Sequence, residues 1–493
     1  MKIKPGCLII AIAVAGAAHA KGPAGFNEAA TARHLASLVA GAEPKTAELT
    51  MFFSQMPKGA DLHHHYSGSI YAEQYVQWLD PLNYCVNMNT YRIETKKEVV
   101  DAERAKSALE RTCLGTKEVL ADDAMYRELL QRWSSKDFDN HGAIKPPPDR
   151  QFFQTFSYFG AVSNQNFAQG LQELKKRAIQ ENVGYIETMF KNTPSVVNPD
   201  FDSAMWQTGA TDVQLADAMR AWSAKLDQDP GFKSNRDDFL KKLDAAASGI
   251  DDERFTMRYQ VYVVRLLNPS LVFSSMLQAF RAAEQSPLVV GVNIVGQESA
   301  HVSMRDYALH MKMFQFLKTQ YPKVKLALHA GELALGDVPP DGLRSHIDQA
   351  LHVAGAERIG HGLDLAHESN AVGIMKTMRE RDIPVEVNLT SNAFISGIRG
   401  DNHPITIYRK YGVPYVISTD DSGVTRHTLA QEYMLFASRY KVSYAEIKQA
   451  SYNGLKYSFL QDAEKKRLLQ QLDTRFTAFE QSIAKLMAGA RRR

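Results

Sequence analysis

The feature that most constrains the fold is a series of eight short apolar runs, set far apart along the 493-residue chain. Most of them are apolar nearly throughout, which is typical of strands buried on both faces of a parallel sheet. Helical stretches such as residues 306–320 separate them. Strands that alternate with helices in this way predict an α/β protein, a (β/α)8 TIM barrel. The runs are "GADLHHH" (59–65), "VGYIETMF" (183–190), "RYQVYVVRLL" (258–267), "LVVGVNIVG" (288–296), "VKLALHAGE" (324–332), "RIGHG" (358–362), "IPVEVNLTS" (383–391) and "VPYVISTDD" (413–421).

The alternative α/β architecture is an open, doubly wound sheet. That fold needs a glycine-rich phosphate turn after its first strand, and the sequence has none there. The chain is 44% hydrophobic, which is ample for a large core. Domain-size priors would allow two or three domains, but a single barrel with insertions also reaches this length.

The spacing of the apolar runs predicts the domain organisation. Residues 21–55 should form an N-terminal helical extension, followed by the barrel over residues 56–493. Two intervals, at about 70–182 and 191–257, are longer than one crossover helix. We interpret both as helical insertions on the barrel rather than as separate domains.

The first twenty residues have the pattern of a secretory signal. Lys2 and Lys4 precede the apolar run "CLIIAIAVAGA", and "AHA" follows at 18–20. A charged start, a short apolar run and a small-x-small site predict a signal peptide at residues 1–20, cleaved near Ala20. The alternative is an uncleaved membrane anchor, for which the run is short. We therefore expect a periplasmic or secreted protein with no membrane association after cleavage.

Export bears on the cysteines that would remain after cleavage, Cys85 and Cys113. An oxidising compartment favours a disulfide between them, and two buried thiols are the alternative.

Lys and Arg total 58 against 55 Asp and Glu, a formal net charge of +3. This balance argues against a nucleic-acid partner, which would require a concentrated basic stripe. The sequence leaves the oligomeric state open, a homodimer included.

Polar residues gather where the predicted strands end, the edge of a TIM barrel that carries the chemistry. Side chains alternate between the two faces of a strand, so His63 and His65 point one way and His64 the other. An inward H-x-H pair suits zinc but is common without a metal. His329 and Asp420 end other strands, and a metal would remove the cost of burying that carboxylate. Three imidazoles and a carboxylate predict a metal site with one position open for water, and His64 is expected to be a packing residue.

Several motifs then match a known family. The segments "MPKGADLHHHYSG", "LHAGE", "RIGHGLDL", "HPI" and "GVPYVISTDD" resemble, in order and rough spacing, those of the adenosine and AMP deaminase family of the amidohydrolase superfamily. The length, the signal and the N-terminal extension are similar to those of exported, growth-factor-type adenosine deaminases. The resemblance runs from about Met56 to Asp421 and is thin across 70–182.

The resemblance implies a role for each site residue. Glu332 would protonate the purine ring nitrogen beside the amino-bearing carbon, and His361 would orient the attacking hydroxide and take part in its proton transfers. Asp421 would hydrogen-bond the imidazole-ring nitrogen of the purine, and the backbone of Gly296 would contact the same ring. The Zn²⁺ ligands would be His63, His65, His329 and Asp420.

The implied function is zinc-dependent hydrolytic deamination of a small-molecule purine nucleoside, adenosine or 2′-deoxyadenosine, to the inosine product plus ammonia. Departures from the family pattern leave the substrate open. Ser67 stands where the family commonly has an aspartate that meets the sugar, and "NIVGQE" at 293–298 differs from the usual "DLAGDE". The alternatives are another 6-aminopurine such as adenine, or a secreted growth-factor-like binding protein of the same fold. The aromatic run "FFQTFSYF" (152–159) resembles the family's apolar lid and is equally consistent with core.

Overall fold

The computed structural model describes residues 23–139 and 146–490. The expected signal peptide, with its cleavage site at Ala20, lies outside the described residues. Export and the state of assembly therefore stay predictions.

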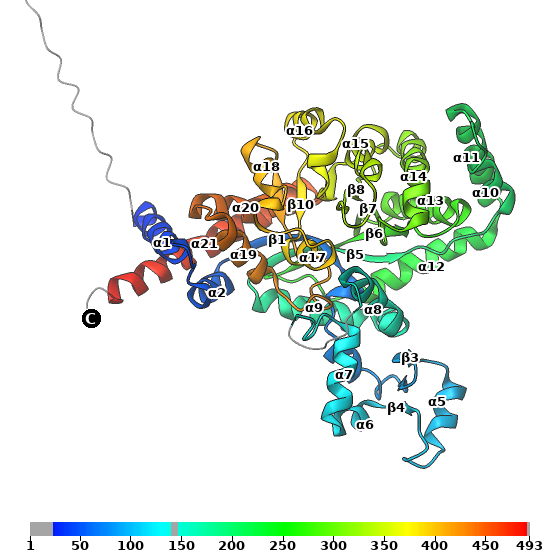
Figure 1. Ribbon diagram of the computed structural model, residues 1–493, viewed down its shortest axis with the longest axis horizontal. Helices are drawn as coiled ribbons and strands as arrows, with labels where there is room; N and C mark the ends of the chain where they lie inside the picture. Colours follow the sequence, from blue (N-terminus) through cyan, green and yellow to red (C-terminus); the bar gives the residue numbers. More distant parts are fainter. Residues whose placement is uncertain (1–22, 140–145, 491–493) are drawn as a thin grey trace, which may run out of the picture.

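Eight parallel strands form the centre of the molecule (Figure 1). They pair as two four-stranded sheets, in the orders β1-β5-β6-β7 and β11-β10-β9-β8. Single bridges, His64 to Asp420 and Val292 to Leu326, join the two sheets at both seams and close the barrel. All eight strands lie within the apolar runs or overlap them, so the predicted (β/α)8 barrel is confirmed. Their bounds are β1 (Lys58–His65), β5 (Val183–Asn192), β6 (Thr256–Val264), β7 (Val289–Val295), β8 (Ala327–Ala330), β9 (Arg358–His361), β10 (Val385–Val387) and β11 (Tyr415–Ile417).

Helices connect the strands and cover the outside of the barrel. The longest connecting helix, α14, shows why: it buries Tyr307, Met311, Phe314 and Leu317, which recur every three or four residues and form one apolar stripe. Such a stripe is stabilised only when it packs against another apolar surface, here that of the strands. The helices are α9 (Phe167–Gln180), α13 (Pro269–Gln285), α14 (His301–Gln320), α15 (His346–Gln349), α16 (Ala371–Glu380), α17 (Leu389–Ile395), α18 (Ile405–Lys410), α19 (Leu429–Tyr440) and α20 (Tyr444–Lys456).

The two ends of the chain lie together. The expected N-terminal extension consists of α1 (Pro23–Val39) and α2 (Thr46–Gln55). Helix α1 packs along the long C-terminal helix α21 (Asp462–Ala490), and α2 packs against α19. Phe52 of α2 meets Phe479 of α21 at 5.1 Å between ring centroids. The extension is therefore continuous with the core rather than a separate unit.

The first insertion differs in part from the purely helical segment expected. Helix α3 (Tyr66–Ser69) leads into it, and its own helices before α9 are α4 (Ala72–Gln77), α5 (Lys97–Arg104), α6 (Thr116–Ala121), α7 (Asp123–Trp133) and α8 (Pro148–Ser163). It also holds an antiparallel sheet of β2 (Cys85–Asn87), β3 (Arg92–Glu94) and β4 (Cys113–Leu114), in the order β3-β2-β4. Strands of two or three residues are too short to show a periodic pattern in sequence.

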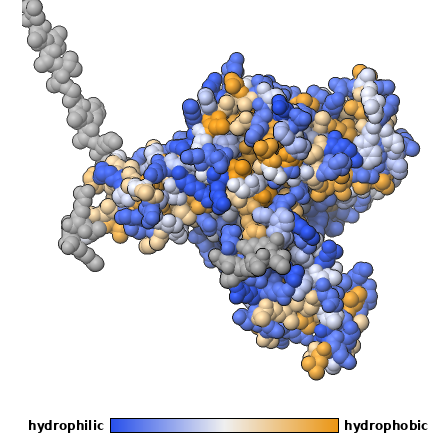
Figure 2. Space-filling view, in the orientation of Figure 1, coloured by the Kyte–Doolittle hydropathy of each residue, from blue (hydrophilic) through white to orange (hydrophobic). Residues whose placement is uncertain are grey.

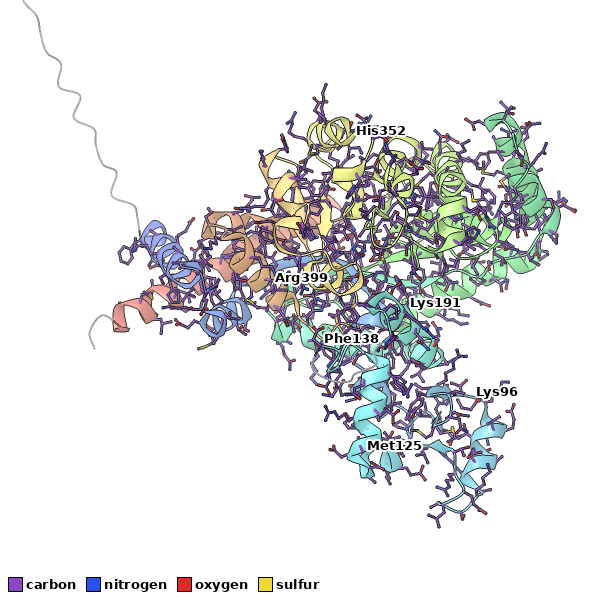
Figure 3. All side chains as sticks on the ribbon, in the orientation of Figure 1. Lys96, Met125, Phe138, Lys191, His352 and Arg399 are labelled. Carbon is purple, nitrogen blue, oxygen red and sulfur yellow. A yellow bond between two sulfur atoms is a disulfide. The ribbon has the colours of Figure 1, made fainter. Side chains whose placement is uncertain are left out.

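A disulfide between Cys85 and Cys113 links β2 to β4 within this insertion (Figure 3). The two cysteines and Val100 of α5 form a small buried cluster of their own. The segment projects away from the barrel in Figure 1 and is too small to build a large core of its own. The disulfide and the cluster around it stabilise the segment instead.

The second insertion is helical, as expected. It consists of α10 (Pro199–Met205), α11 (Asp212–Asp227) and α12 (Pro230–Ala247).

No helix in the described part of the chain is long and apolar enough to cross a membrane. Figure 2 shows hydrophobic residues mixed with hydrophilic ones over the face in view. The most exposed large hydrophobic residues, such as Leu109, Val213 and Val372, lie on distant segments.

Candidate metal and catalytic site

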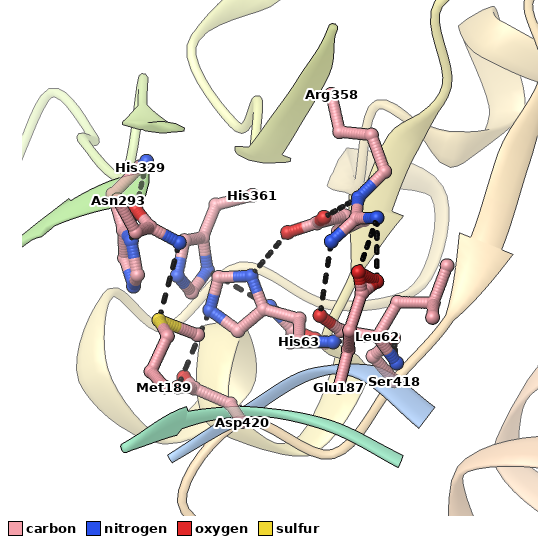
Figure 4. Close-up of polar contacts among 12 residues, drawn as sticks. Leu62, His63, Glu187, Met189, Asn293, His329, Arg358, His361, Ser418 and Asp420 are labelled. Carbon is pink, nitrogen blue, oxygen red and sulfur yellow. Dashed lines mark hydrogen bonds and ion pairs between the residues drawn. The ribbon is translucent and has the colours of Figure 1, made fainter. Parts of the chain in front are cut away.

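Four side chains from three strand ends converge at one end of the barrel. Figure 4 labels three of them, His63, His329 and Asp420. They are the predicted ligands His63, His65, His329 and Asp420, each with one ligand atom within 4.8 Å of all the others. The Nε2 atom of His65 lies 3.2 Å from Nε2 of His329 and 3.1 Å from Oδ1 of Asp420. Nε2 of His63 lies 3.5 Å from the same carboxylate oxygen. The structure thus brings the whole predicted set together, as a metal site requires.

The spacing of these atoms fits a single zinc ion. Four ligand atoms at about 2.1 Å from one zinc lie about 3.0–3.6 Å from one another when a fifth position is open for water, close to the separations found here. Nε2 of His63 is fully buried, and no hydrogen-bond partner for it is found among the described residues. Such an orphaned imidazole nitrogen is costly unless something binds it. Imidazole nitrogen with a single carboxylate is a donor set that suits zinc.

Contacts to Nδ1 fix the orientation of two of the imidazoles, those of His63 and His329. Oε2 of Glu386 accepts a hydrogen bond from Nδ1 of His63 at 2.6 Å, and Oδ1 of Asn293 lies 2.9 Å from Nδ1 of His329. A proton on each Nδ1 leaves each Nε2 with its lone pair toward the metal position. Arg358 in turn holds Glu386, with its Nε 2.6 Å from Oε1. The outer groups thus select the tautomer that a metal ligand needs.

His64 points the other way, as strand parity predicts. Its Nδ1 is 3.0 Å from Oγ1 of Thr188 on β5, and His64 lines a small cavity together with Leu174 and Arg177 of α9. Burial and the nearby Arg177 charge lower the pKa of His64 to about 3. It is a neutral packing residue between β1 and the helical layer, outside the ligand set.

The predicted acid and proton-handling groups lie beside the four ligands. Nε2 of His361 is 3.5 Å from Oε1 of Glu332, and both groups are buried. Burial, reinforced by the charge of Asp420, raises the pKa of Glu332 well above its ordinary value, and the same two causes raise the pKa of Asp421. A protonated carboxyl can donate a hydrogen bond, which both implied roles require. His361 and Asp420 also have left-handed backbones, with φ of 65° and 64°, a strain typical of functional sites.

A cavity of about 380 Å³ opens onto these groups. Ser67 and Gly296, both predicted to bind substrate, lie on its wall together with Glu332, His361 and Asp421. Helix α8 presents some rings of the aromatic run to the cavity and buries others, such as Phe159, in the core. The role as a lid stays a prediction. The apolar lining is Phe152, Phe153, Phe156, Val264, Leu266 and Val295.

Sequence reasoning missed the residues behind the ligands. Glu386 is a charged residue within an otherwise apolar strand run, which was a usable signal. Asn293 was noticed only as a departure from the family pattern. Ser391, whose hydroxyl is 2.5 Å from Oδ2 of Asp420, gave no signal by itself.

The adenosine deaminase family model matches residues 229–475, which is half of the chain. The chain belongs to the adenosine deaminase family. Among curated relatives, the adenosine deaminase of Vibrio parahaemolyticus is 32% identical over 192 residues, which cover 39% of this chain and 52% of the relative. The chain thus spans about half the length of the curated relatives it matches. The matched residues include His329, Glu332, His361 and Asp420, whereas His63 and His65 lie outside the match.

Solved structures show that the fold is that of amidohydrolase deaminases. An N6-mAMP deaminase from Arabidopsis aligns with a TM-score of 0.54 and 18% identity, covering 86% of this chain and 99% of the other. An amidohydrolase from Burkholderia ambifaria with bound Zn aligns with a TM-score of 0.52 and 15% identity, covering 88% and 94%. At these identities the likeness concerns the fold alone. The ligand and substrate roles of individual residues stay predictions.

Proposed function

We propose that the protein is a zinc-dependent deaminase that hydrolyses adenosine or 2′-deoxyadenosine to inosine or 2′-deoxyinosine and ammonia. The observation that carries the proposal is a complete metal-ligand set beside one cavity, whose wall includes the ligands His65, His329 and Asp420 together with Glu332 and His361. In this family such a site acts on the C–N bond of a cyclic amidine. When bound, the zinc would be a Lewis acid that makes water acidic enough to lose a proton near neutral pH.

The chain's own residues account for the remaining steps. Glu332, kept protonated by burial, donates to the ring nitrogen beside the amino-bearing carbon and makes that carbon electrophilic. His361 faces the same point and holds the attacking oxygen in line. Oδ1 of Asp421 is buried, and no partner for it is found among the described residues, so it is available to a purine nitrogen. Water adds its oxygen to the carbon, and a C=O bond replaces the C–N bond as ammonia leaves. Of the two water protons, one restores the proton that Glu332 gave to the ring nitrogen, and the other leaves on the amino nitrogen as part of the ammonia.

The cavity wall fits a flat, uncharged nucleoside. Its volume lies in the usual range of small-molecule sites, about 300–1,000 Å³, and the Phe152, Phe153 and Phe156 rings offer apolar faces. None of the described residues that line it is a lysine or arginine. A nucleoside monophosphate would therefore bring its charge against a wall without a cationic partner. This favours a nucleoside over the N6-mAMP named for the Arabidopsis enzyme.

The experiment is an ammonia-release assay over adenosine, 2′-deoxyadenosine, adenine, AMP and N6-methyl-AMP. We expect the two nucleosides to give the highest kcat/KM. Turnover of free adenine alone would move the assignment to a nucleobase deaminase, and binding without turnover would favour the growth-factor-like alternative.

Glu332→Gln tests the proposed role of Glu332 as the acid. The substitution keeps the side chain's volume and removes the acid, so turnover should fall by about 10²–10⁴-fold. Because Glu332 is outside the four-ligand set, metal content should not change. Loss of the metal in this variant would show that Glu332 is a ligand instead.

We also propose that the protein is exported after cleavage near Ala20. The Cys85–Cys113 disulfide supports this, because such bonds are rare in reducing compartments. N-terminal sequencing of protein from its native compartment tests it, and a chain that still carries Met1 would contradict it.

A further inference from the structure

A line of hydrogen bonds connects the "HPI" motif (403–405) to His361. The backbone N–H of Ile405 lies 3.1 Å from Nδ1 of His403, and Nε2 of His403 lies 3.1 Å from Oδ1 of Asn392. Nδ2 of Asn392 lies 2.9 Å from Nδ1 of His361. All three side chains are buried, so water does not compete for these contacts.

The first donor in this line, the backbone N–H of Ile405, has only one possible role. A backbone N–H can only donate, so Nδ1 of His403 accepts from Ile405 and carries no proton. Burial lowers the pKa of His403 to about 3, with the charge of Arg439 as a second cause. The ring is therefore neutral, and its single proton sits on Nε2, where it is donated to Oδ1 of Asn392.

The direction of hydrogen-bond donation continues through the Asn392 amide to His361. Because Oδ1 of Asn392 accepts from His403, the amide's NH₂ group faces His361 and donates to its Nδ1. Nδ2 of Asn388, also a donor, lies 3.4 Å from the same ring nitrogen. Two donors against Nδ1 require a lone pair there, so the proton of neutral His361 lies on Nε2.

We propose that His403 and Asn392 are positioning residues that fix His361 as its Nε2–H tautomer. Nε2 faces the cavity, and no hydrogen-bond partner for it is found among the described residues. From this position neutral His361 donates a hydrogen bond to the attacking oxygen and has no lone pair on Nε2 with which to accept a proton. Of the two roles that the family resemblance implies for His361, the proposal therefore keeps the orientation of the attacking oxygen and replaces the proton transfer. The catalytic consequence rests on the proposed function, whereas the tautomer does not.

The direct test is ¹⁵N NMR of histidine-labelled protein. The His361 signals are assigned as those missing from His361→Gln. We expect wild-type His361 to have a protonated Nε2 and an unprotonated Nδ1. Asn392→Asp has the same shape but can only accept, so Nδ1 of His361 should gain a proton. A proton on Nδ1 in the wild type, or no change in Asn392→Asp, would overturn the proposal. Both outcomes are independent of whether the substrate has been identified.

Kinetics separate positioning from folding. Asn392→Asp should lower kcat by about 10–100-fold, the size typical of groups behind a first shell, with KM and metal content little changed. His403→Gln, whose amide can also accept from Ile405 and donate to Asn392, should keep kcat within a few-fold, and His403→Leu should not. Asn453→Asp is the matched control, a buried amide that donates to the Tyr415 carbonyl at 3.0 Å. Equal loss of kcat in Asn453→Asp and Asn392→Asp would refute the positioning role.

Discussion

Glu386→Gln tests how the ligand His63 is held. Glu386 is fully buried, with Oε2 2.6 Å from Nδ1 of His63 and Oε1 2.6 Å from Nε of Arg358. Burial alone would raise its pKa, but Arg358 and His63 together lower it, so the group is a carboxylate. Glutamine has nearly the same volume and no charge, so the substitution removes the ion pair without making a cavity.

The expected cost follows from these contacts. Each charge-assisted hydrogen bond contributes about 1.5–3 kcal/mol, and breaking a buried ion pair costs about 3–5 kcal/mol. Arg358 keeps a second carboxylate, Glu187, 2.8 Å from its Nη1. The loss should therefore lie at the lower end, about 3 kcal/mol in the free energy of unfolding. Metal affinity should fall about 10–100-fold, because the tautomer and orientation of His63 are no longer enforced.

The assay compares thermal unfolding and zinc competition in the variant and the wild type. Glu446→Gln is the control, since Glu446 also pairs with an arginine, Arg409, at 2.6 Å, but both side chains are about a quarter exposed. That partly solvated pair should be worth at most about 1 kcal/mol, with no effect on the metal. Unchanged zinc affinity in Glu386→Gln, or an equal loss in the control, would refute the reasoning.

Two further predictions concern residues beside the site and far from it. His64→Ala should keep zinc and turnover and lower only stability, whereas His65→Ala should lose zinc; the reverse result would mean that the strand register is off by one residue. Replacing Cys85 and Cys113 by serine should destabilise the insertion by about 3–4 kcal/mol in the chain-entropy model, seen as earlier proteolysis there. Deaminase activity should persist, and a loss of zinc in the double variant would contradict this separation of insertion and site.

The barrel and the ligand set could be predicted because both follow local patterns. The apolar runs locate the strands, and alternation along β1 separates His63 and His65 from His64. The strand bounds differ from those of the runs: β1 and β5 extend beyond their runs, whereas only Tyr415–Ile417 of residues 413–421 is strand. Asp420 and Asp421 thus lie in the loop after β11, where the backbone N–H of Asp420 donates to the carbonyl of His63 at 2.7 Å.

The supporting groups could not be predicted because their partners are distant in sequence. Glu386 contacts a histidine 323 positions away, and no spacing rule links them. The motif at 403–405 was recognised as part of a family pattern, but its connection to His361 exists only once Asn392 lies between them. The small sheet of the first insertion depends on a disulfide and on a buried cluster rather than on strand propensity.

Zinc titration of the metal-free protein, with ammonia release from adenosine followed in the same samples, tests the central claim most directly. Three imidazoles and Asp420 around one point should bind a single ion tightly. Turnover should therefore rise with bound zinc and reach its maximum at about one equivalent per chain. Full activity in protein that holds far less than one equivalent, unaffected by a strong chelator, would contradict the account.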